Sequence, residues 1–292
     1  EAFTVGTVLY LLTGVAMVAF AANSLLCRLA LAQPRIDPAS FGSIRLVSGA
    51  LVLALIVRMR AGSDAPPRSD WLAATMLFAY VALFSFAYLS LPAGTGALIL
   101  FGAVQLTMLG AGLRAGERFA PAAWAGLAAA IAGLVYLVSP GVSAPAPLGA
   151  TSMALAGAAW GVYSLRGRGI ADPLAATASN FARAVPLALA LSVLTAGAVH
   201  ADGPGVVLAV ASGALSSGIG YVIWYAALRG LTAMRAATVQ LSVPPIAAIG
   251  GTLMLAEPLT PRLMLASAAI LGGIAVVLAT RARAVARGAT GH

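Results

Sequence analysis

The chain has 292 residues, of which 61% are hydrophobic and only 9% are charged, with a mean hydropathy of +0.98. Soluble domains carry about 25% charged residues, so the composition excludes a soluble domain and predicts an integral membrane protein. The 17 basic residues are all arginines and give a net charge of +9. We interpret these arginines as residues at the ends of membrane spans rather than as a nucleic-acid-binding surface.

Ten apolar runs are long enough to cross a bilayer as helices, because a span needs about 20 apolar residues. The predicted spans cover residues 5–27, 40–57, 70–90, 93–113, 121–138, 148–165, 174–196, 204–228, 232–255 and 261–280. Runs of this length without alternation predict helices rather than strands. The first residues, Glu1 to Phe3, lack a basic segment, so the first run is expected to be retained as a span.

A repeat with a fixed offset relates the two halves of the chain. Three residues of the first half recur 140 positions later (250 − 110 = 140): Gly110, Glu117 and Pro121 match Gly250, Glu257 and Pro261. We therefore predict two five-helix repeats, residues 1–140 and 141–292, which meet near the segment Ser139–Pro147. Since five is odd, the second repeat is expected to be inverted in the membrane, as in many transporters.

The arginines predict the orientation of the chain. With both termini in the cytoplasm, the cytoplasmic joints and tail hold most of them: Arg58, Arg60, Arg68, Arg114, Arg118, Arg166, Arg168, Arg229, Arg235, Arg281, Arg283 and Arg287. The positive-inside rule favours this arrangement in a bacterial inner membrane. Arg45 and Arg183 lie deeper, and we expect both to extend toward a membrane surface.

Residues for catalysis or for a metal site are scarce. Cys27 is the single cysteine, and the two histidines, His200 and His292, lie in a joint and at the last position. No Cys pair, His pair or phosphate loop is found, so we predict no enzyme activity, no metal and no cofactor. Glu117 and Glu257 end their spans, where a carboxylate meets free N–H groups of the next helix or an arginine, so we interpret both as structural carboxylates.

Aromatic and neutral polar residues gather on a few helix faces. Trp160, Tyr163 and Ser164 share one face, and Phe20, Asn23 and Ser24 share the matching face. Tyr221, Trp224 and Tyr225 form a third face, and Tyr80, Phe84 and Tyr88 form a fourth. Interfacial belts explain some of these aromatics, but a buried indole or phenol needs a polar partner. The predicted substrate-binding residues are Trp160, Tyr163, Trp224, Phe84, Tyr80, Asn23, Ser24, Gln105, Gln240 and Ser242.

Pro244 and Pro245 fall in the middle of the predicted ninth span. Two missing backbone donors should kink or unwind this helix, and freed carbonyls are tolerated only beside protein or a wet cavity. We predict a hinge at these two prolines.

These motifs resemble the EamA-type drug/metabolite transporters. The phrases that carry the resemblance are "AGTGALIL…GERFAP" and "TAMRAATVQLSVPPIAAIGGTLMLAEPLTP", although Gln105 stands where the second half has proline. The resemblance covers almost the whole chain and implies a bacterial inner-membrane exporter of small metabolites. The chain also looks like the aromatic amino-acid exporter branch.

The predicted function is therefore export of aromatic amino acids by alternating access. One alternative is export of other metabolites or lipophilic cations, although no deep carboxylate supports a strict cation exporter. A second alternative is a non-transporting membrane scaffold with a dry interior. The expected partners are a small-molecule substrate and the lipid bilayer, without nucleic acid. The sequence leaves the oligomeric state open, and a monomer is compatible with it.

Overall fold

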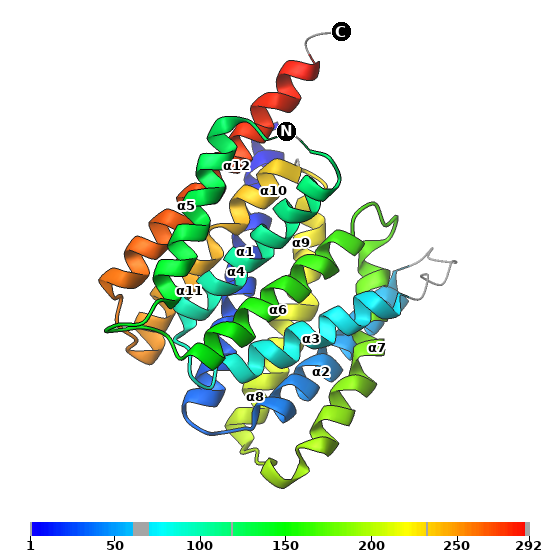
Figure 1. Ribbon diagram of the computed structural model, residues 1–292. Helices are drawn as coiled ribbons and strands as arrows, with labels where there is room; N and C mark the ends of the chain where they lie inside the picture. Colours follow the sequence, from blue (N-terminus) through cyan, green and yellow to red (C-terminus); the bar gives the residue numbers. More distant parts are fainter. Residues whose placement is uncertain (1, 61–69, 118, 232, 290–292) are drawn as a thin grey trace.

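The computed structural model describes residues 2–60, 70–117, 119–231 and 233–289, and within them the fold is an all-helical bundle (Figure 1). The helices of the first half are α1 (Ala2–Ala32), α2 (Pro38–Met59), α3 (Trp71–Ala87), α4 (Ala93–Arg114) and α5 (Pro121–Val138). Those of the second half are α6 (Pro147–Arg166), α7 (Pro173–Leu194), η1 (Ala196–Ala198), α8 (Gly203–Val210), η2 (Ala211–Ile219), α9 (Gly220–Leu228), α10 (Ala233–Gln240), α11 (Val243–Leu255) and α12 (Pro261–Ala289). The predicted start at residue 232 and the predicted basic residues Arg68 and Arg118 lie outside the described residues.

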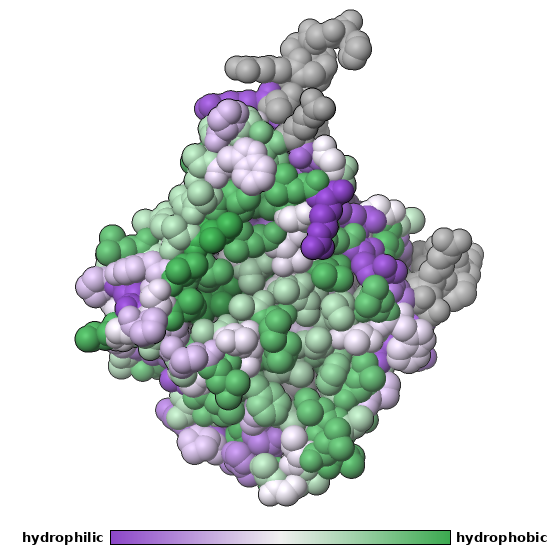
Figure 2. All heavy atoms as spheres, in the orientation of Figure 1, coloured by the Kyte–Doolittle hydropathy of each residue, from purple (hydrophilic) through white to green (hydrophobic). Residues whose placement is uncertain are grey.

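Eight helices in the described part of the chain are long and apolar enough to cross a membrane. The predicted third span corresponds to α3, which is a shorter apolar helix, and the predicted sixth span, α6, is not among the eight. Figure 2 shows apolar side chains over much of the visible face, with hydrophilic residues gathered in separate groups. The chain is therefore a multi-pass membrane protein with eight candidate spans, and the number ten stays a prediction.

Aspartate caps begin four of the helices. Asp37, Asp70, Asp172 and Asp202 accept hydrogen bonds from the third backbone N–H that follows, at the starts of α2, α3, α7 and α8. A carboxylate there satisfies a free N–H group and meets the positive end of the helix dipole. Proline occupies one of the first two helical positions of α2, α7 and α8, where its missing N–H has no cost.

Helices from the two halves of the chain pack on one another. α2 lies against α7, α5 against α12, and α4 against α11 (Figure 1). In addition, α3 and α4 contact α6, while α9 and α11 contact α1. The α5–α12 contact depends on small residues, because a Cβ on Gly126 would lie 2.5 Å from the carbonyl oxygen of Gly273.

Two helices are irregular near the middle of the bundle. The helix over 203–228 passes through the π-helical segment η2, and the predicted ninth span is interrupted between Gln240 and Val243. Pro244 and Pro245 follow in the first turn of α11. The predicted interruption at this point is present, whereas a hinge function is untested and stays a prediction.

The structure corrects the prediction for Arg45. This residue is only 1% exposed and does not reach a membrane surface, because its guanidinium binds groups inside the bundle. Two helices are also longer than predicted. α1 continues to Ala32 and α12 to Ala289, because the added residues are mainly Ala, Leu and Arg, which favour helix.

Candidate functional site

A cavity of about 690 Å³ lies inside the bundle and is lined by residues of both halves of the chain. Its wall takes residues from α1, α3, α4, α6, α7, α9, α10 and α12. Aromatic rings form much of this wall: Phe20, Tyr80, Phe84, Phe101, Trp160, Tyr163, Tyr221, Trp224 and Tyr225. A volume of this size holds a small molecule.

Trp160 is the centre of the aromatic wall. Its ring centroid lies 4.7 Å from Tyr80, 5.3 Å from Tyr163 and 5.8 Å from Tyr221. The ring centroid of Phe20 lies 5.8 Å from that of Tyr221 and 5.7 Å from that of Trp224. Rings at these separations hold one another in place, so the wall presents fixed apolar faces to a flat ligand.

The cavity brings together nine of the ten predicted substrate-binding residues. Its lining includes Trp160, Tyr163, Trp224, Phe84, Tyr80, Asn23, Ser24, Gln105 and Gln240. Ser242 is exposed, does not line the cavity, and donates a hydrogen bond to the carbonyl of Val239. It lies in the turn between α10 and α11, after the face that carries Gln240 has ended.

Polar groups interrupt the aromatic wall at a few points. The buried Asn23 and Gln105 and the half-buried Gln240 bring amide groups to the cavity. The amide oxygen of Asn23 accepts hydrogen bonds from Ser212 at 2.8 Å and from Ser217 at 3.4 Å. With its oxygen occupied, Asn23 has an NH₂ group to offer to a ligand.

The π-helical segment η2 explains why these two serines bind the same atom. Ser212 and Ser217 are five residues apart, which separates them around an α-helix but brings them together in a helix with i→i+5 hydrogen bonds. This segment packs closely on α2, since a Cβ on Gly213 would collide with Ser48 and with the carbonyl of Arg45. The sequence shows the small residues but not the change of helix type.

Arg45 lies directly behind the cavity wall. Its Nη2 donates to the hydroxyl of Tyr80 at 3.0 Å and its Nε to Ser217 at 3.3 Å. Its Cζ lies 5.2 Å from the ring centroid of Tyr80 and 5.0 Å from that of Phe84. The burial of Arg45 is not evident from the sequence, because this residue lies near the start of α2, from where an arginine usually reaches the membrane surface.

α7 supplies two further polar residues that were not predicted from the sequence. Thr177 and Asn180 are buried and line the cavity, and the hydroxyl of Thr177 lies 2.7 Å from that of Tyr225. A signal was available for Asn180, because an amide within an apolar span costs several kcal/mol unless it faces a polar interior.

One end of the cavity reaches the arginine-rich joints. Asp70, Arg166, Arg168 and Arg281 belong to its lining at this end. Arg166 donates to Asp70 at 2.7 Å, while Arg168 makes no ion pair with any described residue. Although partial burial raises the pKa of the Asp70 carboxyl, hydrogen bonds from Arg166 and from the N–H of Ala73 hold it below its usual value.

The other end is closed by a network around Glu257. Its two carboxylate oxygens accept from Nε of Arg28 at 2.9 Å and from the N–H of Ala93, the first residue of α4, at 2.7 Å. Arg28 also donates to the carbonyl of Tyr88 at 2.9 Å. Arg28, Ala93 and Glu257 are absent from the cavity lining, so the cavity does not extend to this network.

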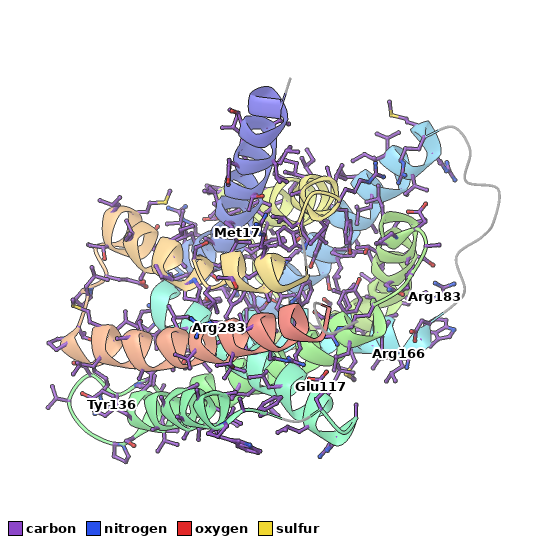
Figure 3. The ribbon with its side chains drawn as sticks, turned by 90° about the horizontal axis from the view of Figure 1, so that it is seen from above. Met17, Glu117, Tyr136, Arg166, Arg183 and Arg283 are labelled. Atoms are coloured by element: carbon purple, nitrogen blue, oxygen red, sulfur yellow. The ribbon has the colours of Figure 1, made fainter. Side chains whose placement is uncertain are left out.

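The matching carboxylate, Glu117, lies at the other end of the bundle and forms an ion pair with Arg281 of α12. Figure 3 labels Glu117, which lies close to α12. The residues before the two glutamates share a left-handed backbone, with φ of 86° at Gly116 and 54° at Ala256. Each glutamate forms an ion pair with an arginine, Glu257 with Arg28 and Glu117 with Arg281. A structural role for both glutamates stays a prediction.

Comparison with known proteins identifies the family. The model of the EamA-like transporter family matches residues 147–279. A probable terminal-alkyne amino-acid exporter of Streptantibioticus cattleyicolor is 32% identical over 229 residues, which cover 73% of this chain and 72% of the exporter. The chain belongs to the EamA-like transporter family. An uncharacterized protein of Pseudomonas aeruginosa is 54% identical over 95% of this chain and 96% of its own length.

A solved crystal structure has the same fold as this EamA-like transporter. The two align with a TM-score of 0.64 over 92% of this chain and 97% of the other, at 23% sequence identity. Members of the family are membrane transporters of the drug/metabolite transporter superfamily rather than enzymes. The family therefore accounts for a cavity inside an apolar bundle, with lipid outside and a small-molecule substrate within.

Proposed function

We propose that this EamA-like transporter exports aromatic amino acids across the bacterial inner membrane, with both termini in the cytoplasm. The observation that carries the proposal is the cavity of about 690 Å³, whose wall is built from nine aromatic rings with amides and hydroxyls among them. Stacking on Trp160 and Trp224 would hold the ring of the substrate, with Phe84 and Tyr80 beside it.

The polar residues of the cavity suit the other end of such a substrate. Asn23, Ser24, Gln105 and Gln240 offer donors and acceptors for an ammonium and a carboxylate group. The similarity to a probable exporter of terminal-alkyne amino acids supports an amino-acid substrate. The aromatic preference rests on the rings of this chain alone.

The packing of the helices supports ten spans in two inverted repeats, over 1–140 and 141–292. The starts of α4 and α10 and those of α5 and α12 repeat at the offset of 140 found in the sequence (233 − 93 = 261 − 121 = 140). If each helix is replaced by its counterpart in the other half, the α3–α6 contact becomes the α9–α1 contact. The pairs α2–α7, α4–α11 and α5–α12 each map onto themselves. Two opposed repeats around a central cavity are suited to alternating access.

The two ends of the cavity support the same mechanism. At the closed end Arg28 binds Glu257. The offset of 140 relates these residues to Arg168 and Glu117, which belong to the open end, where Glu117 binds Arg281 instead. In the opposite state, Arg168 would bind Glu117 and the contact between Arg28 and Glu257 would open. With the arginine-rich face in the cytoplasm, the structure corresponds to an inward-open state.

Flux in proteoliposomes tests the function. Purified protein should carry radiolabelled tryptophan, phenylalanine and tyrosine down a gradient, and unlabelled aromatic amino acids should compete with the label. Flux of a lipophilic cation or of aliphatic metabolites without flux of the aromatic amino acids would establish the alternative substrates instead. The same assay with and without a pH gradient distinguishes facilitated diffusion from proton exchange.

A further inference from the structure

Arg45 is a buried positive charge without a carboxylate partner. Every carboxylate in the described part of the chain is bound at a helix end: Asp37, Asp70, Asp172, Asp202, Glu117 and Glu257. The remaining two, Glu1 and Asp64, belong to the residues that the structure does not describe. The three donor nitrogens of Arg45 find only a tyrosine hydroxyl and a serine hydroxyl, and its Nη1 has no partner among the described residues.

Such a charge is costly to keep. Arginine stays protonated in proteins, and a buried ion is normally paired because desolvation costs several kcal/mol. Cation–π contacts with the rings of Tyr80 and Phe84 offset part of this desolvation cost. The guanidinium keeps its full positive charge beside these rings, so a negatively charged group of a ligand would supply the missing counter-charge.

The geometry connects this charge to the cavity. Tyr80 and Phe84 stand between Arg45 and the cavity, which both of them line. Because the oxygen of Tyr80 already accepts from Arg45, the proton of its hydroxyl is directed to another acceptor. Ser217 joins Arg45 to Asn23, which also lines the cavity. Tyr80 and Asn23, which both belong to the cavity lining, thus carry two donors that are connected to Arg45 by hydrogen bonds.

We infer that Arg45 is the specificity-determining residue for a carboxylate group of the substrate, which binds between Tyr80 and Asn23. Arg45 acts through these two residues and across the low-dielectric wall, where a positive charge attracts an anion more strongly than in water. The site therefore selects carboxylates over amines that carry the same ring. This inference rests on the proposed function, because the aromatic amino acid is the ligand that brings the carboxylate.

A set of indole ligands tests the inference. Tryptophan, indole-3-propionate and tryptamine share one ring, but only the first two carry a carboxylate, and tryptamine carries the amine alone. Binding of the indole ligands to the purified full-length protein is measured by competition with labelled tryptophan. Binding of labelled norleucine, an aliphatic amino acid that carries a carboxylate, is measured directly. We expect both indole carboxylates to bind the wild type at least about tenfold more tightly than tryptamine.

The Arg45→Met variant should lose this preference, whereas Arg45→Lys should keep part of it. Tyr80→Phe retains the ring and its packing and removes only the hydroxyl, so it should reduce the preference. It keeps the inference testable if Arg45→Met fails to fold. Arg183→Met is the matched control, because Arg183 lies on α7 over the ring of Trp71, outside the cavity lining (Figure 3).

The outcomes separate this inference from the proposed function. An equal preference in wild type, Arg45→Met and Tyr80→Phe, with tryptophan still bound, would overturn the role of Arg45 and leave the proposed function standing. Binding of norleucine that depends on Arg45, without binding of any indole, would support the carboxylate site and refute the aromatic substrate. Binding of none of these ligands would overturn both.

Discussion

Replacement of Glu257 by glutamine should open the closed end of the cavity. The carboxylate holds α11 to α1 through Arg28 and to the first turn of α4 through the N–H of Ala93. Glutamine keeps the shape and one acceptor oxygen but removes the charge. The conformation with this end closed should therefore lose stability relative to the opposite conformation.

The magnitude follows from the two hydrogen bonds. Hydrogen bonds to charged groups contribute about 1.5–3 kcal/mol and neutral ones about 1 kcal/mol. The side chains of Arg28 and Glu257 are 18% and 13% exposed, so solvent screens the pair only in part. A loss of about 2 kcal/mol is expected, which shifts the equilibrium between the two conformations roughly 30-fold.

Thiol labelling measures this shift. Ser164→Cys, in a Cys27→Ser background, places one accessible sulfhydryl in the cavity, because Ser164 lines it and is only half-buried. In oriented vesicles, Glu257→Gln should raise the rate of labelling by a membrane-impermeant reagent applied from the Glu257 face. Glu117→Gln is the matched variant at the other end and should not raise it. An unchanged rate in Glu257→Gln, with labelling from the open end intact, would refute the reasoning.

Three further predictions follow from single residues. Trp160→Ala should weaken tryptophan binding by about 2–4 kcal/mol through loss of the central ring, whereas Ser242→Ala should leave binding in the same assay within about twofold. Ala256→Gly should stabilise the protein by about 1 kcal/mol in thermal unfolding, because alanine is strained at φ 54°; a lower Tm would contradict this. Asp37 and Asp70 have carboxyl pKa values below 3.8, despite the opposing effect of burial, because of their hydrogen bonds. The stability that these two carboxylates contribute is present above pH 3.8 and should be lost as the pH falls below it. The decrease in Tm between pH 6 and pH 3 should therefore be smaller in Asp70→Asn than in the wild type.

The helix boundaries were well predicted because the signals are local. Proline or a capping aspartate lies at the start of most helices, and both act within one turn. The end of α12 was missed because hydropathy ends there while helix propensity continues, whereas the predicted end of α1 stopped just before Arg28 although the apolar run resumes up to Ala32. Hydropathy predicts which residues lie in the membrane, whereas helix propensity predicts how far the helix extends beyond it.

The candidate site was predicted where one helix face carries several aromatic or polar residues. Trp160 with Tyr163 and Asn23 with Ser24 show this, since i, i+3 and i+4 spacing needs no tertiary information. The contact between Arg45 and Tyr80 joins α2 to α3, and only the packing of these helices brings the two side chains together. The π-helical register that pairs Ser212 with Ser217 occurs where this segment packs closely on α2, a contact that the sequence pattern does not show.

The placement of the four tryptophans gives the protein two separate optical reporters. Trp160 and Trp224 belong to the cavity wall, while Trp71 and Trp124 are 57% and 51% exposed on the outside of the bundle. A non-emitting ring that enters the cavity should quench the first pair and spare the second, whereas brominated lipid should do the reverse. Intrinsic fluorescence can therefore separate occupancy of the cavity from changes in the surrounding bilayer without any attached dye.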